Sequence, residues 1–105
     1  MITEIVTFRI KGGMDRGDVV ALYAKSVPAW KENSNLLHKS FLYDAERETG
    51  GGVYLWNSVE AAHEAHGKAF KDRIEAVFGS VPEFSYFESP IVINNHVGAE
   101  IKLAD

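Results

Sequence analysis

The 105-residue sequence contains no cysteine, which excludes disulfides, thiolate zinc sites, iron–sulfur clusters and thiol nucleophiles. Basic residues are also few. Eleven Lys and Arg stand against fifteen Asp and Glu, so the net charge of −4 supplies no overall positive field for nucleic acid. No apolar run is longer than a strand, so we expect no membrane span. The N-terminus lacks a basic region and an apolar signal core, so we expect a cytoplasmic protein.

The remaining composition is typical of one globular domain. With 46% hydrophobic and 25% charged residues, the chain can fold around a core of its own. We place a single domain at residues 1–105, with a core of about 2–95 and a tail of 96–105. A chain this short supports only a limited core, so burial against a second copy would add stability.

Hydrophobic periodicity predicts an α+β fold. Strands are expected over residues 2–10, 36–44, 53–56 and 84–93. A first helix begins near Asp15 or Asp18, and Pro28 should kink or restart it. The glycines of residues 50–52 are expected in a hairpin connection, and Gly67 interrupts the second helix. The resulting β-α-β-β-α-β order is the ferredoxin-like arrangement, in which both helices cover one face of a four-stranded antiparallel sheet.

Both faces of this sheet carry apolar residues. Residues 36–44 are expected to place Leu37 and Phe41 on one face and Leu36 and Leu42 on the other. A sheet with one face in water should instead alternate cleanly between apolar and polar residues. We therefore expect a second copy of the chain to bury the other face, in a symmetric homodimer.

The segment from Gly51 to His66 combines a strand, a helix cap and a helix with almost no loop. Asn57 or Ser58 is expected to cap the helix. Val59, Ala62, His63 and His66 then fall at i, i+3, i+4 and i+7. This spacing predicts an inward helix face that carries two histidines.

The element order, the strand at Gly51–Trp56, the helix start at Ser58–Ala62 and the doubly apolar sheet resemble the dimeric α/β-barrel superfamily. Within it, the chain most resembles the YdhR-like group of small monooxygenase-like proteins, over about residues 2–95. The resemblance implies a homodimer whose two sheets form a barrel, with a small-molecule pocket between each sheet and its own helices. Members of the superfamily include cofactor-free oxygenases, haem-degrading enzymes and ligand-binding modules.

The haem-degrading members place an asparagine on the first strand and a histidine ligand on the late helix. Here the first strand has no asparagine, and the late helix, Phe70 to Phe78, has no histidine. We therefore do not carry over haem binding, and we expect no cofactor.

His63 and His66 are the candidate catalytic residues, since a histidine can accept a proton from an enolic or phenolic substrate. The alternative is two helix histidines without a catalytic role, one half-buried and one solvated. Zinc would need at least a third ligand, and Glu60 and Glu64 are no obvious match, so we expect no metal site.

Aromatic and polar strand residues are the candidate substrate-binding groups. Tyr54 and Trp56 point to the same side of the sheet and could form a wall for a flat ligand. The alternative, which is common for central strands, is core or interface packing. Arg9 or His38 could hold an oxyanion, or Arg9 could instead pair with a carboxylate at the barrel rim. Trp30 is a further residue that could line the pocket.

The resemblance therefore implies a cofactor-independent monooxygenase that acts on a small planar aromatic or enolic compound, with His63 or His66 as the base. Two alternatives stay open: a non-catalytic dimeric ligand-binding module, and a lyase or isomerase of a small keto or enol compound.

Overall fold

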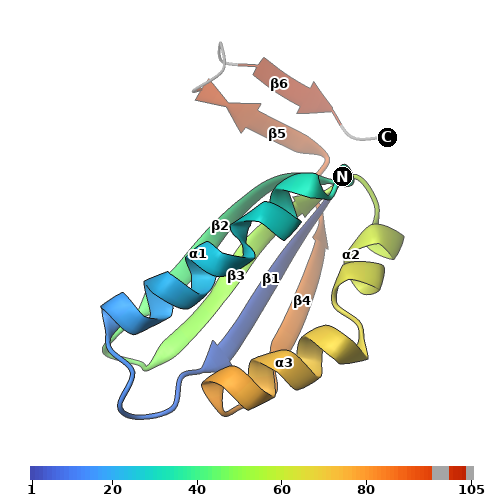
Figure 1. The fold of residues 1–105 in the computed structure, drawn as a ribbon. Helices are drawn as coiled ribbons and strands as arrows, with labels where there is room; N and C mark the ends of the chain where they lie inside the picture. Colours follow the sequence, from blue (N-terminus) through green and yellow to red (C-terminus); the bar gives the residue numbers. More distant parts are fainter. Residues whose placement is uncertain (96–99, 104–105) are drawn as a thin grey trace.

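The computed structural model describes residues 1–95 in full and residues 100–103 as backbone. Its elements are β1 (Ile2–Arg9), α1 (Arg16–Glu32), β2 (Leu36–Asp44), β3 (Thr49–Trp56), α2 (Val59–Ala65), α3 (Lys68–Phe78), β4 (Glu83–Glu88), β5 (Ile91–Asn94) and β6 (Glu100–Leu103). Strands β1 to β4 form one antiparallel sheet in the order β2-β3-β1-β4. The three helices lie on one face of this sheet (Figure 1). The predicted α+β, ferredoxin-like fold is confirmed.

The core lies between the sheet and the helices. On β1, alternate residues are buried against the helices, and they include Val6, Phe8 and the carboxylate residue Glu4. The helices contribute Val19 from α1 and Phe70 from α3, among others. Because each strand buries every second side chain, the position of Glu4 in this alternation forces its carboxylate into the interior.

The three glycines predicted as a hairpin connection lie inside strand β3 instead. A Cβ on Gly50 would collide with the Tyr23 hydroxyl of α1. A Cβ on Gly51, whose φ is +153°, would collide with the Val6 carbonyl oxygen on β1. The glycines are therefore needed for close packing, and the sequence signal that usually marks a turn marks a close approach here.

The first helix begins as predicted, next to Asp15. Asp15 caps it, and the side chains of Asp15 and Asp18 each accept a hydrogen bond from the other's backbone N–H. Pro28 does not restart the helix, which runs on to Glu32. A proline removes one backbone donor, and Trp30, two residues later in the same helix, packs against the core.

The second helical region is two helices, separated at Gly67 as predicted. Ser58 caps α2 by accepting a hydrogen bond from the Ala61 N–H. The prediction that both histidines face inward is wrong for His63, which is exposed, whereas His66 is buried. The inward face of this seven-residue helix is centred on Ala62, and His63 lies about 100° further round the axis.

A bulge in β2 reverses the predicted faces of two leucines. Leu36 pairs with Trp56 and the next pair is His38 with Leu55, so Leu37 is the extra residue. Leu36 consequently packs against the core, whereas Leu37 is 50% exposed. Periodicity alone could not place this bulge.

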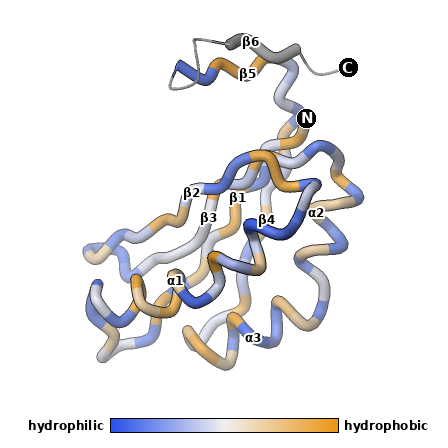
Figure 2. Tube along the Cα trace, turned by 45° about the horizontal axis from the view of Figure 1, so that its top comes forward, coloured by the Kyte–Doolittle hydropathy of each residue, from blue (hydrophilic) through white to orange (hydrophobic). Residues whose placement is uncertain are grey.

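The predicted last strand is two strands, because it breaks at Ser89 and Pro90. Proline cannot donate to a ladder, and after it β5 leaves the main sheet and pairs with β6. In Figure 2, β5 is largely hydrophobic and stands apart from the helix-covered sheet. The side chains of the predicted tail, residues 96–105, lie outside the described residues.

The sheet face opposite the helices carries apolar side chains, which we call the outer face: Ile5, Leu42, Val53, Leu55 and Phe87. None of the helices covers it (Figure 1), and Phe87 is 56% exposed. Among the residues that the structure describes, no helix combines the length and hydropathy that a membrane crossing requires.

Candidate active site

A cavity of about 550 Å³ lies between α1, α3 and the sheet. Its floor includes Gly51 and its walls include Tyr23, Trp30, Tyr54 and Phe70. The missing side chain at Gly50 leaves room for Tyr23, whose hydroxyl accepts a hydrogen bond from the Gly51 N–H at 3.1 Å. The same hydroxyl donates to the Leu42 carbonyl at 2.8 Å, so the floor of the cavity is fixed.

Two of the predicted aromatic residues line this cavity. Trp30 of α1 and Tyr54 of β3 meet edge to face, with ring centroids 5.3 Å apart. Trp56 lies behind Tyr54, stacked on it at 5.8 Å, and is fully buried outside the cavity lining. Both strand aromatics lie on the same side of the sheet, as predicted, and this side faces the helices; only Tyr54 presents its ring to the cavity.

Lys39 is a cavity residue that sequence reasoning missed. Its Nζ donates to the Tyr54 hydroxyl at 2.7 Å. The Nζ also lies 4.0 Å from the Trp30 ring centroid, 4.1 Å from that of Phe41 and 4.2 Å from that of Tyr54. Alternation along β2 carries a signal for it, since Lys39 falls on the same face as Phe41.

Burial and charge act on Lys39 in opposite directions. Burial lowers the pKa of Lys39 to about 7, and the negative charge of Glu4 works against that shift. The surrounding ring faces also attract the ammonium form. Burial raises the pKa of Tyr54 above its ordinary value, so the Tyr54 hydroxyl stays protonated at neutral pH. At neutral pH Lys39 is therefore divided between its ammonium and amine forms, and it presents an amino group to the cavity beside the Tyr54 hydroxyl.

A buried polar cluster lies directly behind the aromatic wall. Glu4 is 0% exposed, and its carboxylate accepts a hydrogen bond from the Trp56 indole N–H at 2.9 Å. His66 Nδ1 lies 2.8 Å from the same carboxylate. A carboxylate only accepts hydrogen bonds, so Nδ1 must carry the proton in this pair.

The other ring nitrogen of His66 has no hydrogen-bond partner among the described residues, although it is buried. The His66 ring packs 4.3 Å from the Phe70 centroid, 4.6 Å from that of Tyr54 and 5.5 Å from that of Trp30. All three of these neighbours line the cavity. Nε2 is therefore an unused acceptor one aromatic layer away from the cavity.

Tyr86 of β4 completes the surroundings of Glu4. Burial raises the pKa of Tyr86 to about 12, with further contributions from the charge of Glu4 and a hydrogen bond to it. The Tyr86 ring also meets the His63 ring edge to face at 5.1 Å. Sequence reasoning missed both Glu4 and Tyr86 as members of the site.

The structure does not bring the remaining predicted residues to the cavity. Arg9 is exposed at the end of β1, where its backbone N–H and carbonyl both bond the Ser80 hydroxyl at 2.8 Å. His38 is exposed and borders a second, smaller hollow of about 270 Å³. His63 is exposed on α2. The site roles of these three residues stay predictions.

Metal-ligating side chains do not gather in the described part of the chain: no group of three His, Asp or Glu residues there could hold an ion. The arrangement instead offers an apolar, largely aromatic cavity with one lysine and one tyrosine hydroxyl, backed by a buried carboxylate–imidazole pair.

No protein-family model matches the sequence, and no curated protein matches it. Solved structures do match the fold. An antibiotic biosynthesis monooxygenase aligns with a TM-score of 0.66 and 16% identity, over 85% of this chain and 98% of its own. The monooxygenase from the gene ActVA-Orf6 of Streptomyces coelicolor, solved in complex with nanaomycin D, aligns with a TM-score of 0.67 and 15% identity, over 89% of this chain and 90% of its own. SnoaB, a cofactor-independent oxygenase from Streptomyces nogalater, aligns with a TM-score of 0.61 and 14% identity, over 84% of this chain and 91% of its own.

Identities of 14% to 16% show a common fold and leave activity open. None of these comparisons tests the narrower resemblance to the YdhR-like group. The chain has the ferredoxin-like fold of the antibiotic biosynthesis monooxygenases.

Proposed function

We propose that the protein is a cofactor-independent monooxygenase that acts on a small planar aromatic or enolic compound bound in the cavity. The observation that carries this proposal is the buried His66 ring, held through Nδ1 by Glu4 with Nε2 left without a partner. A buried polar atom without a hydrogen bond costs about 1–3 kcal/mol. A substrate hydroxyl would supply the missing partner.

The Glu4–His66 pair has the arrangement of an oriented general base. The carboxylate fixes the Nδ1–H tautomer, which leaves the lone pair of Nε2 free to accept a proton. Nε2 lies one aromatic layer behind the cavity, so the proposal requires the Tyr54 or Phe70 ring to move aside before a substrate hydroxyl reaches this lone pair. The anion so formed would be held by the Lys39 ammonium and the Tyr54 hydroxyl, which already lie 2.7 Å apart at the cavity.

In this proposal the substrate anion supplies the electrons for oxygen activation. It transfers one electron to O₂, and the substrate radical and superoxide combine. Return of the proton from His66 gives a hydroperoxide, and loss of water from it leaves a carbonyl on the ring. One oxygen atom enters the product and the other leaves as water, so no added reductant is needed. The fold shared with a cofactor-independent oxygenase supports this reaction class.

We further propose that the protein is a homodimer through the outer face. Val53 and Leu55 from β3 and Ile5 from β1 are only half-buried there, and Phe87 is exposed. A sheet face with this many apolar residues and no covering helix favours a second sheet as its partner. The cavity lies on the opposite face, so each protomer would carry its own site.

Oxygen uptake with a panel of hydroquinones and dihydroxynaphthalenes tests the reaction. We expect uptake that survives EDTA and needs no added flavin. In His66→Gln, the amide N–H can still donate to Glu4 but no basic nitrogen remains, so uptake should fall by about 100-fold or more. In His63→Gln, most activity should remain because the ring is exposed.

Thermal melts of both variants keep loss of the fold apart from loss of the base. A folded His66→Gln protein with wild-type uptake would refute the role of His66. Tight binding without uptake for every compound would instead favour a ligand-binding module. Conversion of a keto or enol compound without oxygen uptake would favour a lyase or isomerase.

A further inference from the structure

The cavity is positively charged, although the whole protein is acidic. Three cationic residues line it, namely Lys25, Lys39 and Arg73, and no acidic residue lies among the described residues of its lining. The chain as a whole has a net charge of −4. At neutral pH Lys25 and Arg73 carry full positive charges and Lys39, with a pKa of about 7, carries a partial one. This local excess of positive charge is therefore a property of the site and not of the surface in general.

These three cations also have no carboxylate partners within the described residues. Other cations do pair there: Lys68 bonds Asp72 at 2.5 Å, and Arg47 lies 3.7 Å from Asp44. The Lys39 amino group donates a hydrogen bond to the Tyr54 hydroxyl and contacts the faces of the surrounding aromatic rings. Unpaired cations around a cavity leave their hydrogen-bond donors available to a ligand.

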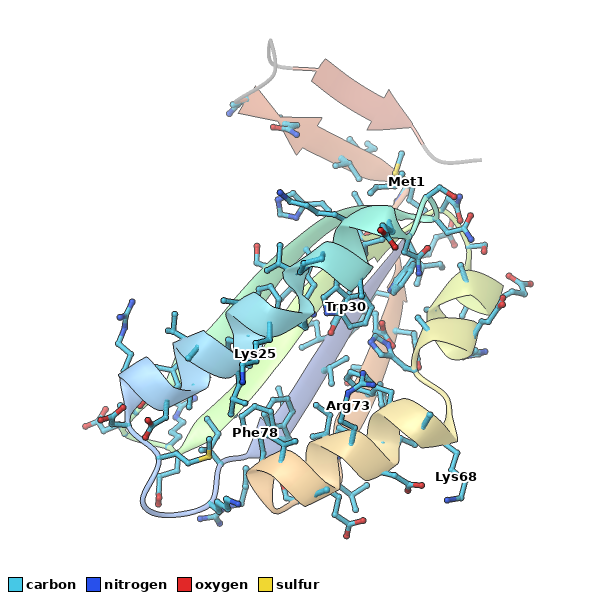
Figure 3. The ribbon with its side chains drawn as sticks, in the orientation of Figure 1. Met1, Lys25, Trp30, Lys68, Arg73 and Phe78 are labelled. Carbon is cyan, nitrogen blue, oxygen red and sulfur yellow. The ribbon has the colours of Figure 1, made fainter. Side chains whose placement is uncertain are left out.

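The three cations reach the cavity from three different elements. Lys25 comes from α1, Lys39 from β2 and Arg73 from α3. In Figure 3, the Lys25 and Arg73 side chains both extend into the space between α1 and α3. Arg73 also lies 5.6 Å from the Phe70 ring centroid, which keeps its guanidinium beside the aromatic wall.

We propose that the cavity selects a planar aromatic compound that carries a carboxylate in addition to its reactive hydroxyl, with the carboxylate bound by Lys25 and Arg73. This inference rests on the proposed function, in which Lys39 and Tyr54 hold the reactive oxygen at the inner end of the cavity. A guanidinium fork matches the two oxygens of a carboxylate, and Lys25 adds a second positive charge from the facing helix. The remaining walls are mainly apolar and aromatic, as a flat ring requires.

Binding of a matched pair of compounds tests this selection without any turnover. We would titrate 1,4-dihydroxy-2-naphthoate and its methyl ester into the full-length protein by calorimetry in the absence of oxygen. The two compounds share the ring and both hydroxyls, and differ in the charge of the acid group and in the one methyl group that removes it. We expect the acid to bind about tenfold more tightly at low salt, and the difference to shrink as salt rises.

Charge-removing variants identify the residues responsible. Lys25→Gln and Arg73→Gln should each weaken binding of the acid about 3–10-fold, because both side chains are exposed and their charges partly screened. Neither variant should change binding of the ester. Lys68→Gln removes the same charge from α3 away from the cavity lining and should leave both affinities unchanged.

Equal affinity of the wild-type protein for acid and ester would overturn the inference, and so would no binding of either. An equal loss in Lys68→Gln and Arg73→Gln would also overturn it, since the effect would then be one of overall charge. Oxygen uptake is judged separately. Tighter binding of the acid without oxygen uptake would refute the oxygenase reaction and support the charge selection. Oxygen uptake with both compounds at equal affinity would support the oxygenase reaction and refute the charge selection.

Discussion

One substitution at Glu4 should separate stability from catalysis. Glu4→Gln keeps the shape of the side chain but replaces one of its two acceptor oxygens with a donor. Trp56 Nε1, at 2.9 Å, can only donate, so the glutamine oxygen must face it. His66 Nδ1 lies 2.8 Å from both carboxylate oxygens, and its hydrogen bond is to Oε2, which the amide NH₂ then replaces. For that contact to be a hydrogen bond, His66 must accept at Nδ1 and carry its proton on Nε2.

The magnitudes follow from this exchange of donors and acceptors. In Glu4→Gln every atom of the cluster that was bonded keeps a partner, and only the strength of a charged acceptor is lost. We expect a loss of about 1–2 kcal/mol in the free energy of unfolding. In Glu4→Ala the Trp56 and His66 N–H groups are left buried without an acceptor, so about 3–5 kcal/mol should be lost.

Oxygen uptake should fall strongly even in Glu4→Gln, the variant that loses little stability. Once Nε2 carries the proton it cannot accept one, so oxygen uptake in Glu4→Gln should fall by about 10²–10⁴ although the fold is retained. Denaturant unfolding followed by tryptophan fluorescence gives the stability of both variants. Nitrogen NMR of the His66 ring reports which nitrogen is protonated. Glu64→Gln, an exposed position on α2, is the matched control and should change neither quantity.

Two results would refute this reasoning. Wild-type uptake by a folded Glu4→Gln protein would show that the tautomer of His66 does not matter to the reaction. A proton still on Nδ1 in that variant would show that the hydrogen bonds of the cluster are arranged differently from those described.

Three further predictions test other parts of the structure. Burial holds the pKa of Lys39 at about 7, below its ordinary 10.5, so the unfolded chain binds more protons between these values and the free energy of unfolding should rise with pH across that window. Denaturant titrations at several pH values should lose this component of the rise in Lys39→Met. Phe87→Glu, which puts a charge on the outer face, should convert a dimer to a monomer by light scattering, whereas Val20→Glu, on the exposed side of α1, should not. Trp30→Ala removes part of the cavity wall and one of the aromatic rings that contact the Lys39 amino group. Calorimetry should therefore show the affinity for dihydroxynaphthalenes falling at least about tenfold.

The order of elements could be predicted because each strand and helix repeats its apolar residues at the spacing of its own type. The β1 alternation, the capped start of α1 and the left-handed Gly79 at the end of α3 are local signals of this kind. The errors in the fold prediction arose where a tertiary contact determines the local backbone structure. The glycines of β3 serve a close approach to Tyr23, and the bulge at Leu37 depends on pairing with β3.

The candidate site was predictable only in part, because its residues come from distant positions. Tyr54 and Trp30 could be chosen as wall residues from their type and their expected face. The two partners of Glu4 stand 52 and 62 residues away from it in the chain, and no spacing rule connects residues at such distances. Lys39 was hidden for a different reason, since a lysine on a strand is usually solvated, and only the facing rings reveal that this one is not.

The buried cluster itself carries the strongest argument for a function. Glu4 and His66 are the buried ionisable residues of the described core. A buried carboxylate gives up its hydration, so well-packed apolar residues of the same size often stabilise a protein as much or more. Stability therefore does not explain why a strand that is otherwise apolar on its inner face carries a glutamate opposite Tyr86 and beside Trp56. A role in catalysis does explain it. Trp56 bonds the Glu4 carboxylate, and the carboxylate in turn fixes the His66 ring with its free nitrogen behind the cavity wall.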